Sequence, residues 1–441
     1  MGAQSPTEFD NGSLIYDQWL VNAQAKTDFD LGLYDDVFFT IGAEYRKENY
    51  KIQAGEQASY LTVLDSQGVP VAAGGAQVLA GFSPASAVDE TRNNIALFAE
   101  FDTYLSENWN LVFATRFEDY NDFGSTLTGK LASRYVFNEN LSFRGALSSG
   151  FRAPSLAQTS YKSIATVFED GQPNEVGLFP VDTTAAKALG AKPLEAEESV
   201  NITAGFIYEY DNFSLTLDAY QIDIDDRIVL SENLSGPAVE QILKTAGENN
   251  VQRVRYFTNA IDSSTRGVDI VATYGFDLEA LGMLNLSVAV NFNDTEVTNV
   301  KANPTELSDL GEDYQYFARR EIARFEDATP KDKWNLVATW RFEQWTSTVK
   351  ATRYGEVQDP SSNIDNDEVL AAKWITDLDI AYRVNEQWRL AIGANNVFDQ
   401  YPQDTVGNIG FSNFNQIFPY SAFSAYNTDG RFVYAKVSMT F

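Results

Sequence analysis

The sequence of 441 residues contains no cysteine and no histidine. Disulfide bonds, thiolate metal sites and imidazole metal ligands are therefore excluded. The usual general base at neutral pH is also missing, and the chain shows neither a nucleophile elbow nor a glycine-rich phosphate loop. A hydrolase could still work with carboxylates, so an enzyme is not excluded by composition.

Long hydrophobic runs are missing too. No stretch approaches the roughly 18 apolar residues of a membrane-spanning helix, and the mean hydropathy is −0.27. This excludes a helical membrane protein but not a β-barrel, in which only alternate residues face lipid. The first ten residues have neither the basic segment nor the apolar core of a signal peptide. Because an outer-membrane protein needs such a leader, we expect an upstream segment that is missing or removed.

Basic residues are few: 32 lysines and arginines stand against 62 acids, a net charge of −30. Such a chain is a poor partner for nucleic acid, which binds basic surfaces. The acids can gather divalent cations, but we favour the simpler role of keeping long loops soluble. Aromatic residues make up 13%. They suit the interfacial girdles of a membrane barrel, although an aromatic-rich soluble β-protein would share them.

The last segment, residues 431–441, alternates strictly between apolar and polar or amphipathic side chains. Val433, Ala435, Val437, Met439 and Phe441 are its apolar members. A period of two places each set on one face of a strand. Because similar segments of about ten residues recur along the chain, the pattern predicts an all-β fold, a membrane antiparallel β-barrel with apolar side chains toward lipid.

About fifteen such strands can be placed. Short turns rich in Asn, Asp, Gly and Glu join them in pairs, and mostly long loops join the pairs. Long extracellular loops and short periplasmic turns are typical of outer-membrane barrels. Bacterial barrels have even strand numbers, so either the amino-terminal part of a larger barrel is absent or one strand is missed. The expected strands are 14–26, 37–50, 94–105, 109–118, 127–137, 141–148, 200–209, 213–225, 265–276, 283–293, 332–342, 346–354, 373–383, 388–398 and 432–441.

Two segments resemble signatures of one family. Residues 141–156, LSFRGALSSGFRAPSL, are similar to the mid-barrel signature of TonB-dependent outer-membrane receptors, and residues 391–402, AIGANNVFDQYP, to their penultimate strand. The aromatic end of the last strand fits as well. The motif residues are Gly150, Phe151, Arg152 and Pro154 in the first segment, and Asn395, Asn396, Phe398 and Asp399 in the second.

The resemblance implies a location and a function. Family barrels have about 22 strands and a plugged lumen, so residues 1–441 look like the carboxyl-terminal part of one barrel domain, without the plug domain. The location would be the cell outer membrane of a Gram-negative bacterium. The partners would be outer-membrane lipid, the TonB complex through the missing plug, the barrel-assembly machinery and a small-molecule ligand. The function would be TonB-coupled uptake of a scarce nutrient such as an iron-siderophore, vitamin or glycan. No bond is made or broken in such uptake, so the resemblance implies no enzyme, no catalytic residue, no metal site and no cofactor.

Two other functions stay open. A passive porin of 14 or 16 strands would be complete as given, and an adhesin or enzyme barrel would use the same wall. Sizeable open-channel conductance without a plug would favour the porin. Loss of activity on changing a lumen carboxylate would favour an enzyme.

The family motifs have architectural explanations. Pro154 lacks an N–H and ends a strand ladder, while Arg152 can reach carboxylates or carbonyls of the loops. Asn and Asp side chains can cap backbone groups where a strand becomes a loop. By resemblance, the last strand carries the assembly signal, at Val433, Val437, Met439 and Phe441.

Ligand contact is expected from the last long loop, if anywhere. Its aromatic rings can stack on a siderophore, cobalamin or glycan, or can pack the loop upon itself. The candidates are Phe411, Phe414, Tyr420 and Tyr426. A second loop, residues 363–368, places carboxylates at alternate positions as a calcium loop does. It lacks the glycine and the distal glutamate of an EF-hand, so we favour a solvated loop.

Overall fold

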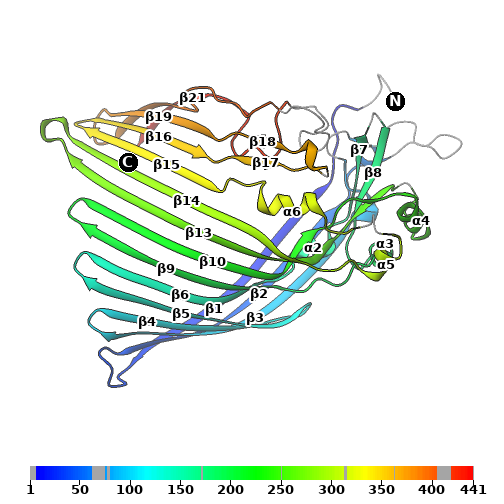
Figure 1. The fold of residues 1–441 in the computed structure, drawn as a ribbon, viewed down its shortest axis with the longest axis horizontal. Coiled ribbons are helices and arrows are strands. Elements are labelled where there is room, and N and C mark those ends of the chain that lie inside the picture. Colours follow the sequence, from blue (N-terminus) through cyan, green and yellow to red (C-terminus); the bar gives the residue numbers. More distant parts are fainter. Residues whose placement is uncertain are drawn as a thin grey trace.

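The computed structural model describes residues 6–61, 75–76, 80–169, 172–249, 251–311, 315–361, 363–404 and 419–440. Within these ranges fifteen strands form one antiparallel sheet, whose order follows the chain (Figure 1). Each of the fifteen expected segments corresponds to one of them. They are β1 (Ser13–Phe29), β2 (Val37–Gln53), β3 (Val88–Ser106), β4 (Trp109–Tyr120), β5 (Gly124–Asn138), β6 (Leu141–Arg152), β9 (Glu197–Tyr210), β10 (Phe213–Leu230), β13 (Phe257–Asp277), β14 (Met283–Val300), β15 (Asp332–Phe342), β16 (Trp345–Tyr354), β19 (Lys373–Arg383), β20 (Trp388–Asn395) and β21 (Phe432–Met439).

The hairpin turns lie at one end of the sheet and the long loops at the other, as expected, and the short β4–β5 turn lies at the long-loop end (Figure 1). Several turns use residues with positive φ, which tight hairpins require. Asp211 has a φ of 52°, Glu343 of 50° and Gly282 of 82°. Asn138 instead accepts hydrogen bonds from the backbone N–H groups of Asn140 and Leu141, both at 2.9 Å. The asymmetry between the two ends is therefore encoded in local turn chemistry.

The strand register separates an apolar outer face from a polar inner face. Leu390 lies opposite Val437 and Trp388 opposite Met439, while Arg389 lies opposite Ser438 on the other face. Val437 is 63% exposed, so no second sheet covers it. The register places Leu390, Ile392, Val437 and Met439 on one face and Arg389, Lys436 and Ser438 on the other, in agreement with the alternation, so we assign the apolar face to lipid.

The sheet has two open edges. In the described part of the chain, β1 pairs only with β2, and β21 pairs only with β20. With fifteen antiparallel strands, β1 and β21 run parallel to each other, so an antiparallel ring cannot close between them. The structure thus has the open wall that the odd strand count predicts.

The long loops hold more regular structure than their sequence suggests. Four short strands form a second sheet in the order β11-β12-β8-β7, and helices pack beside it. None of the helices in the described ranges is long and apolar enough to cross a membrane. The elements of the long loops are α1 (Gln57–Tyr60), η2 (Pro84–Ser86), α2 (Leu156–Ser160), β7 (Ser163–Glu169), β8 (Gln172–Leu178), α3 (Thr184–Ala188), β11 (Leu234–Ser235), α4 (Pro237–Thr245), β12 (Arg253–Arg255), α5 (Thr305–Ser308), α6 (Arg319–Glu326), β17 (Val357–Asp359), η4 (Ile364–Asn366) and β18 (Glu368–Leu370). The short turn between β13 and β14 contains η3 (Glu279–Leu281).

Three of the long loops share a hydrophobic core and form what we call the loop cap, residues 178–194, 231–249, 251–256, 301–311 and 315–328. Its largest fully buried side chains are Tyr256, Phe179, Leu189, Leu243 and Leu307. The longest wall strands exceed what a membrane crossing requires: β13 has 21 residues, whereas a strand that crosses a bilayer needs roughly 9–11. The outer ends of the longest strands therefore rise out of the membrane and carry the cap.

Candidate functional site

A polar network covers the inner face of β2, β3 and β4. Arg116 contacts Glu44 at 3.1 Å and Glu118 at 2.5 Å. Glu118 also accepts hydrogen bonds from Asn94 at 2.6 Å and Tyr120 at 2.9 Å. Because residues two apart share a face, these side chains meet across neighbouring strands. The network fixes the shape of the polar surface that a solute in the lumen would meet.

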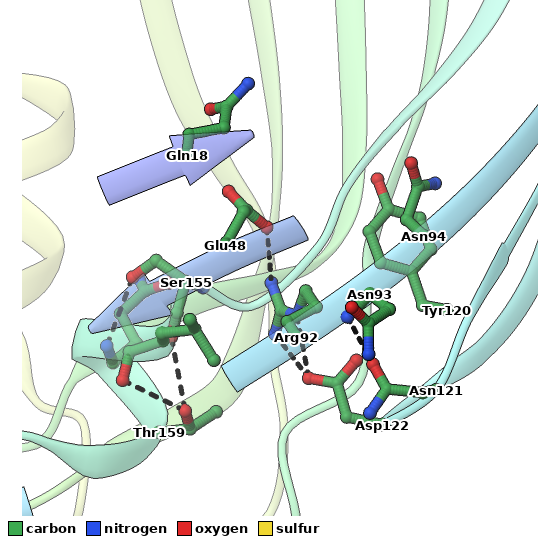
Figure 2. Close-up of polar contacts among 12 residues, drawn as sticks. Gln18, Glu48, Arg92, Asn93, Asn94, Tyr120, Asn121, Asp122, Ser155 and Thr159 are labelled. Atoms are coloured by element: carbon green, nitrogen blue, oxygen red, sulfur yellow. Dashed lines mark hydrogen bonds and ion pairs between the residues drawn. The ribbon is translucent and has the colours of Figure 1, made fainter. Parts of the chain in front are cut away.

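Arg92 anchors the outer end of this network (Figure 2). Its Nε and Nη2 atoms lie 2.8 and 2.6 Å from Asp122 Oδ2, and Nη1 lies 4.0 Å from Glu48 Oε2. The guanidinium carbon also lies 5.8 Å from the ring centre of Tyr120 and 5.5 Å from that of Phe123. Arg92 is only 3% exposed. It therefore serves to hold β2, β3 and the β4–β5 turn together.

The mid-barrel motif directs the chain from the wall into the loops. Arg152, the last residue of β6, donates two hydrogen bonds to Glu197, at 2.7 and 2.5 Å. Glu197 is buried and also accepts the backbone N–H of Ile228 at 2.7 Å. Phe151 packs edge-on against Tyr120, with ring centres 6.0 Å apart. These contacts match the architectural explanation of the motif.

Helix α2 follows the motif and lies against the inner wall. Pro154 is fully buried, and Ser155 then caps the helix reciprocally with Gln158, through hydrogen bonds of 3.1 and 2.9 Å. Leu156 packs against Tyr50 and Ile52 of β2. Helix α2 contacts β2 and β3, the strands that carry Glu48 and Arg92 (Figure 2). The motif thereby places a polar helix beside the network on the inner face.

The penultimate-strand motif closes the next corner. Asn396 has a φ of 51° and exchanges two hydrogen bonds with the backbone of Gln400, at 2.7 and 2.9 Å. Asp399 accepts the backbone N–H of Arg431 at 2.8 Å, just before β21 begins. Asn395 pairs with Phe432, whereas Phe398 is 67% exposed. Three of the four motif residues thus hold the end of β20 and the start of β21.

The last loop and strand are described in part. Val433 and Met439 lie on the exposed outer face of β21 with Val437, while Phe441, Phe411 and Phe414 lie outside the described residues. Tyr420 stacks on Tyr401 with ring centres 6.2 Å apart, and Tyr426 donates a hydrogen bond to the Tyr401 carbonyl at 3.2 Å. The two described tyrosines therefore pack the loop upon itself, and a role in ligand contact stays a prediction.

The acidic loop at residues 363–368 holds an ion pair. Asp367 accepts hydrogen bonds from Arg319, from Gln358 at 2.7 Å and from the Ser361 N–H at 2.8 Å. Burial alone would raise the pKa of Asp367, but these hydrogen bonds hold it below its usual value. No group of three or more candidate metal ligands occurs among the described residues. Asp367 therefore fixes the loop to α6.

A buried charged cluster inside the loop cap was not found from sequence. Arg324 lies 2.8 Å from Glu321, and Arg255 lies 3.9 Å from the same carboxylate. Burial, and then the neighbouring charge of Glu321, raise the pKa of Glu232, while burial lowers the pKa of Arg255. These residues come from different loops, so no spacing in the sequence could reveal the cluster. On the inner wall, by contrast, the alternation Glu44-Arg46-Glu48 was a readable signal.

Comparison with known sequences places the chain in a family. Residues 2–397 match the family described as TonB dependent receptor-like, beta-barrel. The ferric enterobactin receptor PirA of Pseudomonas aeruginosa is 22% identical over 395 residues, which cover 87% of this chain and 46% of the relative. The vitamin B12 transporter BtuB of Photobacterium profundum is 23% identical over 313 residues, 71% of this chain and 40% of the relative. The chain thus spans less than half the length of either relative.

Solved structures show the same fold. The crystal structure of the siderophore receptor PirA from Pseudomonas aeruginosa superposes with a TM-score of 0.61 at 15% identity, covering 98% of this chain and 58% of that one. The copper transporter OprC gives a TM-score of 0.60 at 13% identity, over 97% and 59%. The chain belongs to the TonB-dependent receptor-like β-barrel family, whose members are outer-membrane transporters of Gram-negative bacteria rather than enzymes.

Proposed function

We propose that residues 1–441 act as one barrel domain of a receptor that imports a scarce nutrient by TonB-coupled active uptake. The nutrient classes that fit are an iron-siderophore, a vitamin, a glycan or a similar small molecule. The observation that supports this best is the loop cap, with a buried core of its own, at the outer end of a polar inner wall. Ordered loops on a rigid scaffold can hold a specific small ligand.

The cap and the inner wall suit selective capture better than free diffusion. Tyr256 and Leu243 are 0% exposed, so the loops are packed together. Helix α2 occupies part of the inner wall. The relatives named for ferric enterobactin, vitamin B12 and copper suggest chelates and vitamins as classes to test first. Coupling to TonB through a plug, and insertion by the barrel-assembly machinery, are parts of this proposal that rest on the family.

The alternatives find less support. A passive porin of 14 or 16 strands does not agree with the fifteen strands counted in the described ranges, nor with the family match. An adhesin or enzyme barrel has no observation in its favour. Uptake that continues without an energised inner membrane would nevertheless favour the passive porin.

The proposal is tested in cells that express the receptor from its native locus. Uptake of radiolabelled ferric catecholate chelates, cobalamin and copper is measured with and without a proton-gradient uncoupler, and with and without TonB. We expect at least one probe to enter only when both the gradient and TonB are present. Uptake of every probe at the same rate in all four conditions would contradict the proposal.

A further inference from the structure

A pocket of about 460 Å³ opens on the outer face of the wall, away from the lumen. Its residues lie in the middle of β14 and at the long-loop ends of β15, β16 and β19. Three aromatic rings and one ion pair line it: Phe292, Trp334 and Trp374, with Asp332 and Arg353. None of these residues belongs to the family motifs or to the loop cap.

The strand register explains why these side chains meet. Phe292 lies opposite Asp332, Trp334 lies opposite Arg353, and Arg353 lies opposite Trp374. Directly opposite residues share one face of an antiparallel sheet. Two residues further along the strands, the same face carries Leu336 and Ala351, and then Ala338 and Val349. The pocket therefore belongs to the lipid-facing surface.

The pocket marks the boundary of that apolar surface. Toward the membrane lies Val349, which is 43% exposed. Toward the loops the same face becomes charged: Asp294 lies two residues beyond Phe292, opposite Arg266, and 2.8 Å from Lys331. Since the long loops are extracellular, this boundary is the headgroup zone of the outer leaflet. An occupant must then have an apolar part below and a polar part above.

The polar lining of the pocket is a neutral pair. Arg353 and Asp332 form an ion pair whose side chains remain 29% and 24% exposed. An isolated phosphate would favour an excess of positive charge, which this pair does not offer. Hydroxyl groups, in contrast, both donate and accept, so they can bond to Asp332 and Arg353 together. The polar chemistry favours a polyhydroxylated group.

The apolar lining supplies ring faces. Phe292 and Trp334 meet edge to face with centres 5.8 Å apart, and Trp374 and Phe292 are 43% and 42% exposed. An ordinary residue of the aromatic girdle only has to lie at the membrane–water interface and needs no cavity beside it. Here the rings surround a cavity that also contains two polar side chains. Aromatic faces beside paired donors and acceptors suit a sugar ring, which has apolar C–H faces and a hydroxylated edge.

We propose that this pocket binds the sugar headgroup of an outer-leaflet glycolipid, whose acyl chains then lie along the apolar strip of β15 and β16. The source is the membrane and not a transported sugar, because the pocket opens toward lipid. The proposal rests on the strand register, which places the pocket on the apolar face that we assign to lipid. It does not depend on which nutrient the receptor imports.

The test uses the receptor purified in detergent and exchanged into nanodiscs of three compositions. One contains a lipid A-type diglucosamine glycolipid, one phosphatidylglycerol and one phosphatidylethanolamine alone. Glycolipid retained per receptor is counted by native mass spectrometry for the wild type, Trp374→Leu, Trp374→Phe and Arg353→Gln. Trp345→Leu is the matched control, since Trp345 lies on the same face of β16 at the short-turn end and is 45% exposed.

We expect Trp374→Leu to weaken glycolipid retention by roughly tenfold, the size of one lost aromatic contact. Trp374→Phe should keep most of it, and Trp345→Leu should leave it unchanged. Heat-modifiable gel migration verifies that each variant is folded. Equal losses of glycolipid retention in Trp374→Leu and Trp345→Leu would overturn the proposal, because any aromatic residue of the interfacial girdle would then have the same effect. Equal retention of phosphatidylglycerol would overturn it in favour of a phosphate site, and unchanged retention in every variant would refute a site altogether.

Discussion

The barrel wall and the loop cap use apolar side chains in opposite ways. Ile392 and Val437 in the wall are each 63% exposed, whereas Leu243 and Tyr256 in the cap are 0% exposed. The wall hides its apolar face in lipid, while the cap hides its apolar residues within the protein. The same apolar residue types are therefore buried against lipid in the wall and against protein in the cap. Substitutions should show which of these environments each region needs.

The largest effect is expected in the cap core. Leu243→Ala should destabilise the cap by about 2–5 kcal/mol, because a fully buried leucine leaves a cavity. Limited proteolysis of intact cells should then cut the loops faster, while the assembled wall remains. Leu127→Ala is the matched control, since Leu127 lies in the wall and is 72% exposed. Equal protease sensitivity in the two variants would contradict the distinction between wall and cap.

The wall should be most sensitive to charge on its outer face. Val437→Arg should cost about 2–4 kcal/mol near the midplane and less toward an interface. The measurement is the fraction of receptor that assembles into lipid vesicles over a urea series. Ser438→Arg places the same side chain one residue further, on the inner face, and should have little effect. A similar loss in Ser438→Arg would show that the facing is wrong.

The contact that joins the loop ends of β6 and β9 should have a smaller effect. Arg152→Ala leaves the buried carboxylate of Glu197 without its paired donor, which should cost about 1–3 kcal/mol. Protease cleavage between β6 and β9 should increase, and Arg152→Lys should fall between the wild type and Arg152→Ala. Cleavage unchanged from the wild type would show that the motif does not hold this junction.

The wall was predictable from sequence and the cap was not. Each wall strand has its own period-two pattern, so Val437 and Leu390 could be assigned to a face without knowing their neighbours. In the cap, β11 has two residues and β12 has three, too few to show a period. Phe179 and Val254 meet only in the folded core. The motif residues could be found by resemblance, but the Arg152–Glu197 pair spans 45 positions of sequence.

The smallest effect is a pH dependence of the cap. Burial raises the folded pKa of Glu232, so the folded cap binds this proton more tightly than the unfolded chain. The stabilisation of the cap by protonated Glu232 is fully present below the pKa of the unfolded state, about 4.3, and is lost as pH rises through the folded-state pKa. Glu232→Gln should therefore protect the loops from proteolysis more at pH 7 than at pH 4. The same gain at both pH values would argue against a raised pKa.

The most direct test of the division between wall and loops is ligand binding normalised to surface-exposed receptor, in cells expressing the protein from its native locus. Deleting residues 408–426 should lower binding per receptor and leave the surface amount unchanged. Deleting Phe441 should do the reverse, because we propose, from the family resemblance, that the last strand carries the assembly signal. The probe is the chelate or vitamin that shows energy-dependent uptake in the wild type. Normalised binding that is unchanged by the loop deletion would contradict the account.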